Sequence, residues 1–236
     1  MGFDGGPSVS AIMLAGGSGS RIAAHHSSDT PKQYLEIGGK SVLSHSVDTF
    51  LQLPFVDEII IVTAREWLDY CKTRAIESHA KIKFAEGGKT RQESSFNGVI
   101  AATCPYVMVH DGARPFVSGD DIERLYGRMI TEGAAILAVP VTDTVKEVDE
   151  MAGSARIKRT LERNTLMAAV TPQAFRRDLL LKAHEAAQKA GFSGTDDASL
   201  LEHMGESVAV VEGSSGNIKI TTKEDLDYAE FVVRSR

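Results

Sequence analysis

Short apolar runs alternate along the chain with segments of helical periodicity. Runs that predict β-strands lie at residues 10–14, 58–63, 81–86, 106–110, 134–140, 208–212 and 217–221. Several are continuous β-branched stretches, which are typical of strands covered on both faces. Between the runs, apolar residues at helical spacing, such as Leu43, Val47 and Phe50, predict amphipathic helices. The alternation predicts an α/β fold with a doubly wound, mostly parallel twisted sheet.

One stretch, from residue 141 to residue 163, interrupts this alternation. Charged positions there alternate with short β-rich pieces at 144–148 and 156–161, and residues 151–154 are typical of a turn. A hairpin this polar is not stable alone in water, so we expect a protruding arm that packs on a second copy of the chain. A solvated insertion loop is the alternative.

The first apolar run leads directly into a glycine-rich segment, Ala15-Gly16-Gly17-Ser18-Gly19-Ser20-Arg21. Glycines let the backbone approach a ligand and direct several N–H groups into one concavity, which suits a polyphosphate. Arg21, together with Lys32 further along, would neutralise the remaining charge. The alternative is a tight turn without a ligand. The segment fits neither a Walker A loop nor a dinucleotide fingerprint, since Ile22 stands where the latter needs a glycine.

A second group of candidate site residues lies at the end of the apolar run at 106–110. In open α/β sheets, ligands bind at the carboxyl ends of the strands. Asp111 at such an end is suited to hold Mg²⁺, although an Asp there is also a common turn cap. Gly112 leaves room for a ribose, and Arg114 is suited to carboxylate or phosphate. His110 is interpreted as structural.

Two further segments carry weaker signals. Gly87 ends another run and precedes a helix whose Thr90 has capping-box spacing. In that helix Ser94 could contact a base edge and Arg91 could support the loop, but a capped helix start explains the pattern equally well. Lys219 lies within the run at 217–221, where it either protects a sheet edge or faces the cleft.

Composition narrows the class of protein. At 236 residues the chain fits one domain, and its net charge of −6 gives no reason to expect nucleic acid or an anionic membrane as a partner. No apolar run is long enough to cross a bilayer, and the first residues do not resemble a secretory signal. Cys71 and Cys104 lack metal-ligand or redox spacing. We therefore expect a cytoplasmic protein with two free thiols.

With these residues in view, the chain resembles the 2-C-methyl-D-erythritol 4-phosphate cytidylyltransferases from about Val9 to Val233. The resemblance rests on the order of its motifs: the glycine-rich segment, 31–34, Gly87-Gly88, 110–115, Asp143-Thr144, 171–173, 195–199 and 217–219. It implies a Rossmann-like nucleotidyltransferase domain spanning 1–236 and a homodimer joined by the arm at about 141–163. It also implies transfer of CMP from CTP to methylerythritol phosphate with release of pyrophosphate.

The resemblance also implies a role for each matching position. Arg21, Lys32 and Lys219 would be catalytic, and Asp111 would hold Mg²⁺. The nucleotide would be bound by Ala15, Gly16, Gly17, Gly19, Gly87, Ser94 and Gly112. The sugar phosphate would be bound by Asp143, Thr144, Arg163, Thr171 and Thr195, with Thr144 and Arg163 reaching it from the partner subunit. Arg91 and Arg114 would give structural support.

Two features depart from the family pattern. The segment from Ile22 to Thr30 is longer than usual, and Lys89 stands where an acidic residue often follows the paired glycines. The opening Leu14-Ala15-Gly16-Gly17 also resembles the ribitol-5-phosphate cytidylyltransferases, the second hypothesis. A nucleotide-binding regulator without turnover is the third, but binding alone would not need Lys32, Asp111 and Lys219 together.

Overall fold

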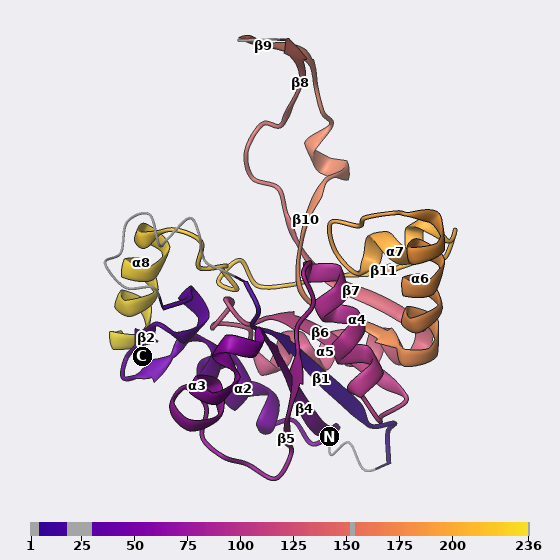
Figure 1. The fold of residues 1–236 in the computed structure, drawn as a ribbon. Helices are drawn as coiled ribbons and strands as arrows, with labels where there is room; N and C mark the ends of the chain where they lie inside the picture. Colours follow the sequence, from indigo (N-terminus) through magenta and orange to yellow (C-terminus); the bar gives the residue numbers. More distant parts are fainter. Residues whose placement is uncertain (1–4, 18–29, 152–153, 236) are drawn as a thin grey trace.

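A computed structural model of the chain describes residues 5–17, 30–151 and 154–235. Its centre is a seven-stranded sheet in the order β11-β7-β10-β6-β1-β4-β5 (Figure 1). The strands are β1 (Val9–Leu14), β4 (Val56–Thr63), β5 (Ile82–Glu86), β6 (Tyr106–Asp111), β7 (Ala134–Pro140), β10 (Met167–Arg176) and β11 (Ala209–Glu212). The pairings β6-β1-β4-β5 and β7-β11 are parallel, and β10 is antiparallel to both its neighbours. The predicted mostly parallel α/β sheet is confirmed.

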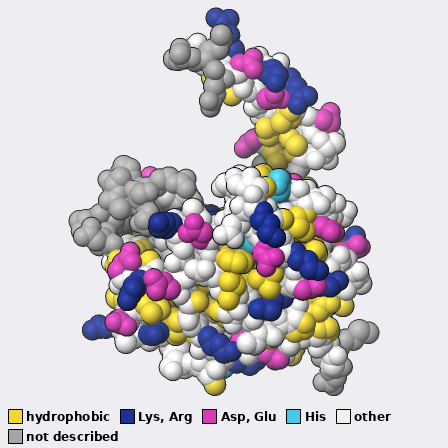
Figure 2. All heavy atoms as spheres, turned by 45° about the vertical axis from the view of Figure 1, so that its right-hand side comes forward, with side chains coloured by type: hydrophobic (Ala, Val, Ile, Leu, Met, Phe, Trp, Pro, Cys, Tyr) yellow, Lys and Arg dark blue, Asp and Glu magenta, His cyan; other side chains and the backbone are white. Residues whose placement is uncertain are grey.

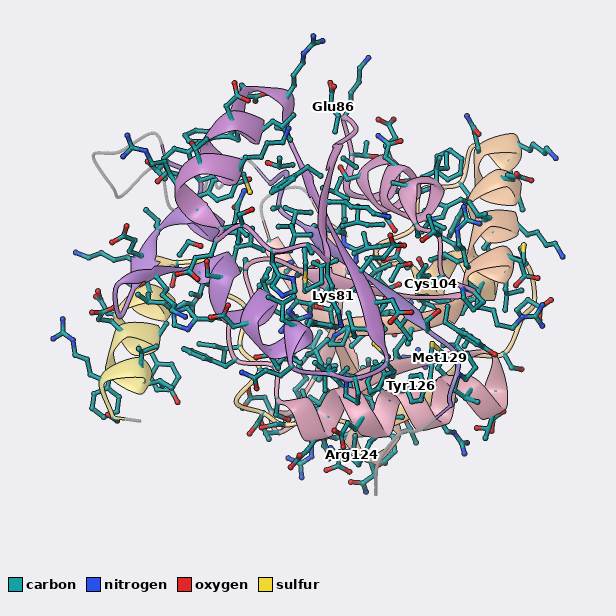
Figure 3. All side chains as sticks on the ribbon, turned by 90° about the horizontal axis from the view of Figure 1, so that it is seen from below. Lys81, Glu86, Cys104, Arg124, Tyr126 and Met129 are labelled. Atoms are coloured by element: carbon teal, nitrogen blue, oxygen red, sulfur yellow. The ribbon has the colours of Figure 1, made fainter. Side chains whose placement is uncertain are left out.

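Helices cover both faces of the sheet because successive strand residues point to opposite sides. One core packs α2 (Val42–Leu51) and α5 (Gly119–Glu132) against one face. A second core packs α4 (Arg91–Ala101), α6 (Arg177–Ala190) and α7 (Ala198–His203) against the other. In Figure 3, Met129 of α5 points toward the sheet and Arg124 points away from it. The sheet is therefore doubly wound.

The pattern of apolar runs fails at two places. The expected strand at 217–221 is an extended segment outside the sheet, held beside the 110–115 turn by one backbone bond from Ile220 N–H to the Ala113 carbonyl. Conversely, β10 is not expected from the sequence. Its register against β7 shifts between Ala169 and Gln173, a stretch that includes Pro172. Proline has no backbone N–H to donate to a neighbouring strand, which explains why the sequence of this stretch does not predict an inner strand.

The helix that follows β5 begins as its capping residues predict. The Thr90 side chain accepts from the Glu93 N–H at 3.0 Å. The Glu93 carboxylate accepts from the Lys89 N–H at 2.7 Å, one residue earlier than in a reciprocal capping box. This arrangement fixes the turn between β5 and α4, which borders the cavity described below.

The predicted hairpin forms between β7 and β10. Its strands, β8 (Lys146–Met151) and β9 (Ser154–Thr160), are antiparallel, and the turn residues 152–153 lie outside the described residues. The arm projects beyond the sheet in Figure 1, and in Figure 2 it stands clear of the body. Val148 and Ile157 are 46% and 65% exposed, so this chain alone does not cover them.

Smaller elements complete the chain. They are η1 (Lys32–Tyr34), β2 (Glu36–Ile37), β3 (Lys40–Ser41), η2 (Arg65–Trp67), α3 (Leu68–Tyr70), the π-helical turn η3 (Cys71–Ala75), η4 (Arg163–Thr165) and α8 (Lys223–Arg234). Cys71 and Cys104 are buried free thiols, as predicted. Across the described ranges, no helix has both the length and the apolar character needed to cross a membrane.

Candidate active site

A cavity of about 410 Å³ opens at the carboxyl ends of the parallel strands. The glycine loop after β1, the turn before α4 and the end of β6 form its walls. The cavity is lined by Leu14, Gly16, Gly17, Lys32, Gln33, Gly88, Lys89, Thr90, Arg91, Ser94, Asp111, Ala113 and Lys219. Another hollow, of about 460 Å³, lies beside α2 and η3. Among the described residues, the first cavity is the one that brings predicted site residues together, so we take it as the candidate site.

The described part of the glycine loop is bound by a glutamine for which the sequence predicts no role. Gln33 donates through Nε2 to the carbonyls of Ala15 and Gly17, at 2.5 and 3.1 Å. Tyr34 adds a hydroxyl contact to the same Ala15 carbonyl at 3.3 Å. These contacts fix the carbonyls of Ala15 and Gly17 beside the cavity, which Gln33 also lines. The predicted residues Gly19 and Arg21 lie outside the described residues.

Ser94 joins the two glycine-rich walls. Its hydroxyl donates to the Thr90 carbonyl at 2.9 Å and accepts from the Gly88 N–H at 3.1 Å. A Cβ at Gly87 would lie 3.2 Å from the same hydroxyl, and one at Gly16 would lie 3.8 Å from it. The structure therefore brings Ser94, Gly16 and Gly87 together as predicted. Gly88, not Gly87, lines the cavity.

Asp111 lies in the cavity among three cations. Lys219 Nζ is 2.7 Å from Oδ2, Arg91 Nε is 3.5 Å from Oδ1, and Arg114 Nε is 3.9 Å from Oδ2. Burial by itself would raise the pKa of this carboxyl, but Arg91 and Lys219 outweigh burial and lower the pKa to about 2. Asp111 is therefore ionised at any physiological pH.

Asp111 is positioned from behind by buried groups. Burial lowers the pKa of His110 to about 4, so its imidazole is neutral. Since a carbonyl can only accept, His110 Nε2–H donates to the Arg114 carbonyl at 3.1 Å, and Nδ1 accepts from the Thr171 hydroxyl at 3.1 Å. The Thr171 oxygen accepts in turn from the Asp111 N–H at 3.0 Å. Thr171 is 5% exposed, and its hydroxyl faces this chain of bonds.

Gly112 is buried beneath the loop after β1 and does not line the cavity. Its N–H donates to the Leu14 carbonyl at 2.9 Å, and a Cβ there would lie 2.9 Å from Leu43 Cδ1. Close packing explains this glycine, and the neighbouring Ala113 lines the cavity instead.

Lys219 is held in place by the extended segment 217–221. Asn217 is 3% exposed, and its Nδ2 donates to the Thr171 carbonyl at 2.7 Å. Arg114 Nη1 donates to the Asn217 carbonyl at 2.8 Å, which fits the supporting role predicted for Arg114. Ile220 is fully buried. The segment therefore needs no sheet pairing to bring the Lys219 ammonium to Asp111.

The predicted sugar-phosphate residues do not meet in this cavity within one chain. Asp143, Thr144 and Arg163 lie at the base of the arm, where Arg163 Nη1 donates to the Thr142 carbonyl at 2.7 Å. Thr195 is exposed on the turn before α7. All four are absent from the cavity lining.

Comparison with known proteins identifies the family. The family model of 2-C-methyl-D-erythritol 4-phosphate cytidylyltransferase matches residues 9–235. The chain belongs to this family. A cytidylyltransferase of that name from Caldanaerobacter subterraneus is 41% identical over 96% of this chain and 99% of its own length. The chloroplastic protein of that name from rice is 39% identical over 97% of this chain and 75% of its own length.

Solved structures agree. The crystal structure of 4-diphosphocytidyl-2C-methyl-D-erythritol synthase from Anaerococcus prevotii has a TM-score of 0.83 and 31% identity, over 97% of this chain and 96% of its own. The 2-C-methyl-D-erythritol 4-phosphate cytidylyltransferase from Francisella tularensis has a TM-score of 0.80 and 34% identity, over 95% and 99%. The likeness therefore covers both the fold and nearly the whole sequence.

The donor set of this cytidylyltransferase cavity can be tested against Mg²⁺. The described part of the chain holds no cluster of three or more His, Cys, Asp and Glu side chains that could bind a metal alone. Asp111 provides one ionised carboxylate beside the cations that line the cavity. Mg²⁺ commonly takes one or two carboxylates and completes its coordination with water and substrate phosphates. The residues therefore fit a cation that binds together with a triphosphate.

Proposed function

We propose that this chain transfers CMP from CTP to 2-C-methyl-D-erythritol 4-phosphate. An oxygen of the sugar phosphate forms a bond to the α-phosphorus of CTP, the bond from that phosphorus to the β-phosphate oxygen breaks, and pyrophosphate leaves with its electron pair. The products are 4-diphosphocytidyl-2-C-methyl-D-erythritol and pyrophosphate. The observation that carries the proposal is the cationic cavity at the strand ends, in a chain of this family.

The attacking group is a phosphate oxygen that is already ionised, so the reaction needs no general base. What it needs is positioning and cancellation of charge. Lys32 and Lys219 both line the cavity, and they are assigned to the triphosphate and its transition state. Arg21 is assigned to the same charge on the basis of its place in the sequence.

The base and ribose are assigned to the backbone-rich walls near Gly16, Gly88 and Ala113. Backbone donors and acceptors in fixed positions can recognise a pyrimidine edge and leave the polar edge of a purine mispaired. Asp111 would hold Mg²⁺ with the phosphates, where the ion supplies charge stabilisation to the departing pyrophosphate.

The sugar phosphate is assigned to Asp143, Thr144, Thr171, Thr195 and Arg163. Since no described residue of the arm lines the cavity of its own chain, Thr144 and Arg163 would act from a second subunit. The apolar residues exposed on the arm, Val148 and Ile157, support an isologous dimer in which the two arms are exchanged. We propose that residues 1–236 form one domain and that the dimer is the active species.

A pyrophosphate-release assay tests the function. The purified chain, CTP, Mg²⁺ and methylerythritol phosphate should give pyrophosphate and the diphosphocytidyl product. ATP or GTP should give less than about 1% of that rate, since a mispaired polar site discriminates by several orders of magnitude. Ribitol 5-phosphate serves as the competing acceptor. Equal turnover with a purine nucleotide would overturn the cytidine assignment, and preference for ribitol phosphate would overturn the assigned acceptor.

Two lysine-to-alanine variants, one in the cavity and one on the surface, test the site in the same assay. Lys219→Ala should lower kcat by at least about 100-fold, because it removes a cation from the proposed transition-state site. Lys223→Ala removes an exposed lysine at the start of α8, and it should retain the wild-type rate. Similar rates in the two variants would remove Lys219 from the reaction.

A further inference from the structure

Arg91 lies between two carboxylates and is closer to one of them than to the other. Its Nη2 lies 2.8 Å from Asp197 Oδ2, which is hydrogen-bond distance. Its Nε lies 3.5 Å from Asp111 Oδ1, which is beyond the normal range. The guanidinium therefore forms its shorter ion pair with Asp197 and lies farther from Asp111.

Asp197 is a fixed anchor. Its side chain is 1% exposed, and Oδ1 accepts from the Ser95 hydroxyl on α4. Its backbone N–H donates to Gln173 Oε1 at 3.1 Å, and Gln173 is itself 1% exposed on β10. His184 Nε2 stands 3.8 Å from Oδ1. Hydrogen bonds from α4 and β10 therefore fix the position of the Asp197 carboxylate, so Arg91 must come to it.

The contact has a consequence for the two oxygens of Asp111. Lys219 is at hydrogen-bond distance from Oδ2, whereas the Arg91 nitrogen nearest to Oδ1 stays 3.5 Å away. An arginine without a second anchor closes on a carboxylate through two parallel hydrogen bonds. Here that closure would cover Oδ1, the oxygen that a divalent cation would need.

We propose that Asp197 is a positioning residue that holds Arg91 away from Asp111, so that Asp111 keeps an oxygen for the divalent cation bound with the nucleotide. The proposal rests on the proposed function, in which Asp111 is the metal ligand. Arg91 then stabilises the ionised carboxylate through space without occupying it. Asp197 itself touches neither substrate nor metal.

Mn²⁺ binding tests this without turnover. Electron paramagnetic resonance of free Mn²⁺ gives the affinity of the wild type and its variants in the presence of CTP and in the absence of the sugar phosphate. Asp197→Asn should weaken Mn²⁺ binding about tenfold, because Arg91 is released to close on Asp111. In turnover, the same variant should need about tenfold more Mg²⁺ for half-maximal rate and recover most of its kcat at saturating Mg²⁺.

Control variants separate positioning from damage to the fold. Glu58→Gln neutralises another buried carboxylate, which pairs with Lys83 at the opposite end of the sheet, and this variant should bind Mn²⁺ within twofold of the wild type. In an Arg91→Gln background, Asp197→Asn should cause no further loss. Asp111→Asn gives the loss expected when the ligand itself is removed. If Asp197→Asn does not fold, Asp197→Glu keeps the charge and should bind Mn²⁺ with an affinity between the wild type and Asp111→Asn.

Several outcomes would overturn the proposal. The first is an Asp197 variant that folds and binds Mn²⁺ with wild-type affinity. The second is an Asp197→Asn substitution that lowers Mn²⁺ affinity by the same factor with and without Arg91. The third is an Asp111→Asn variant that keeps the wild-type Mn²⁺ affinity. None of them bears on pyrophosphate release by the wild type, whose absence would instead overturn the proposed function.

Discussion

At the scale of single residues, the site depends on charges that are fixed before any ligand arrives. Asp111 is ionised because Arg91 and Lys219 surround it, and Asp197 holds Arg91 in turn. Such a preorganised cluster needs little rearrangement when a triphosphate binds, which is how charge stabilisation becomes large in a partly buried site. The same arrangement makes each of these groups sensitive to loss of its partner.

A second buried carboxylate, Glu58, lies at the opposite end of the sheet and bears on stability. Glu58 is 4% exposed and accepts from Ser10, from Thr103 and from Lys83 Nζ, the last at 2.5 Å. Burial by itself would raise its pKa, but Lys83 and the other donors lower the pKa from the ordinary value of 4.5 to about 2. A lowered folded-state pKa stabilises the fold above pH 4.5, and this stabilisation is lost as the pH falls toward 2.

We therefore expect the Glu58→Gln variant to lose up to about 3 kcal/mol of unfolding free energy at pH 7. The difference from the wild type should shrink steadily between pH 5 and pH 2, because protonation removes the same interaction from the wild type. Urea unfolding at several pH values measures it. Glu206→Gln changes an exposed glutamate and should stay within about 0.5 kcal/mol of the wild type. A pH-independent deficit for Glu58→Gln would contradict the argument.

The sequence predicts individual site residues where a residue type and its place at a strand end coincide. Asp111 and Lys32 are found in this way, and both line the cavity. Gln33, Asn217 and Asp197 are not, because their roles are contacts with residues far away in the chain. The sequence pattern around a polar turn residue is the same whether its side chain bonds to water or to a distant carbonyl.

At the scale of elements, α4 carries both the Arg91 contact and a tight approach to the sheet. Gly98 is buried in the middle of this helix. A Cβ there would overlap Ile12 Cγ2 and lie 3.0 Å from Val62 Cγ2. Glycine therefore sets how closely α4, and with it Arg91, approaches β1 and β4.

We expect Gly98→Ala to lower the free energy of unfolding by about 1–3 kcal/mol, since strain in a packed core outweighs the better helix propensity of alanine. Gly127 is a helical glycine of α5 where an added Cβ would meet nothing within 4 Å, and Gly127→Ala should raise that free energy by up to about 1 kcal/mol. Thermal or urea unfolding of the two variants measures these changes in the free energy of unfolding. Equal stabilisation by both substitutions would show that the helix can move away from the sheet at no cost.

Elements were predictable where local pattern and tertiary environment agree. β4 contains a continuous β-branched run from Ile59 to Thr63, and the burial of this run on both faces follows directly. β10 has Ala168, Ala169 and Pro172 within it, and only its pairing with β6 and β7 makes it a strand. The segment 217–221 shows the converse, because its apolar positions are buried by a loop and α8 without a ladder.

At the scale of the whole molecule, the arm is the feature that one chain does not explain. It extends from β7 and β10 away from the sheet, with Lys158 and Arg159 paired to Glu147 and with Ile157 exposed (Figures 1 and 2). Surface ion pairs of this kind contribute little stability. A second subunit that covers the apolar positions would give the arm the burial it lacks.

If Arg163 of each chain acts in the site of the partner subunit, two variants that are inactive alone should restore activity when they are mixed. In a heterodimer of Arg163→Ala and Lys32→Ala chains, one site has both mutations and the other has neither, because each site combines its own Lys32 with the partner's arm. Mixing equal amounts, with subunit exchange confirmed by mass spectrometry, should restore roughly a quarter of the wild-type pyrophosphate-release rate, since half of the dimers are mixed and half of their sites are intact. Each homodimer alone should stay inactive. No recovery despite exchange would mean that Arg163 serves the cavity of its own chain, or no cavity at all.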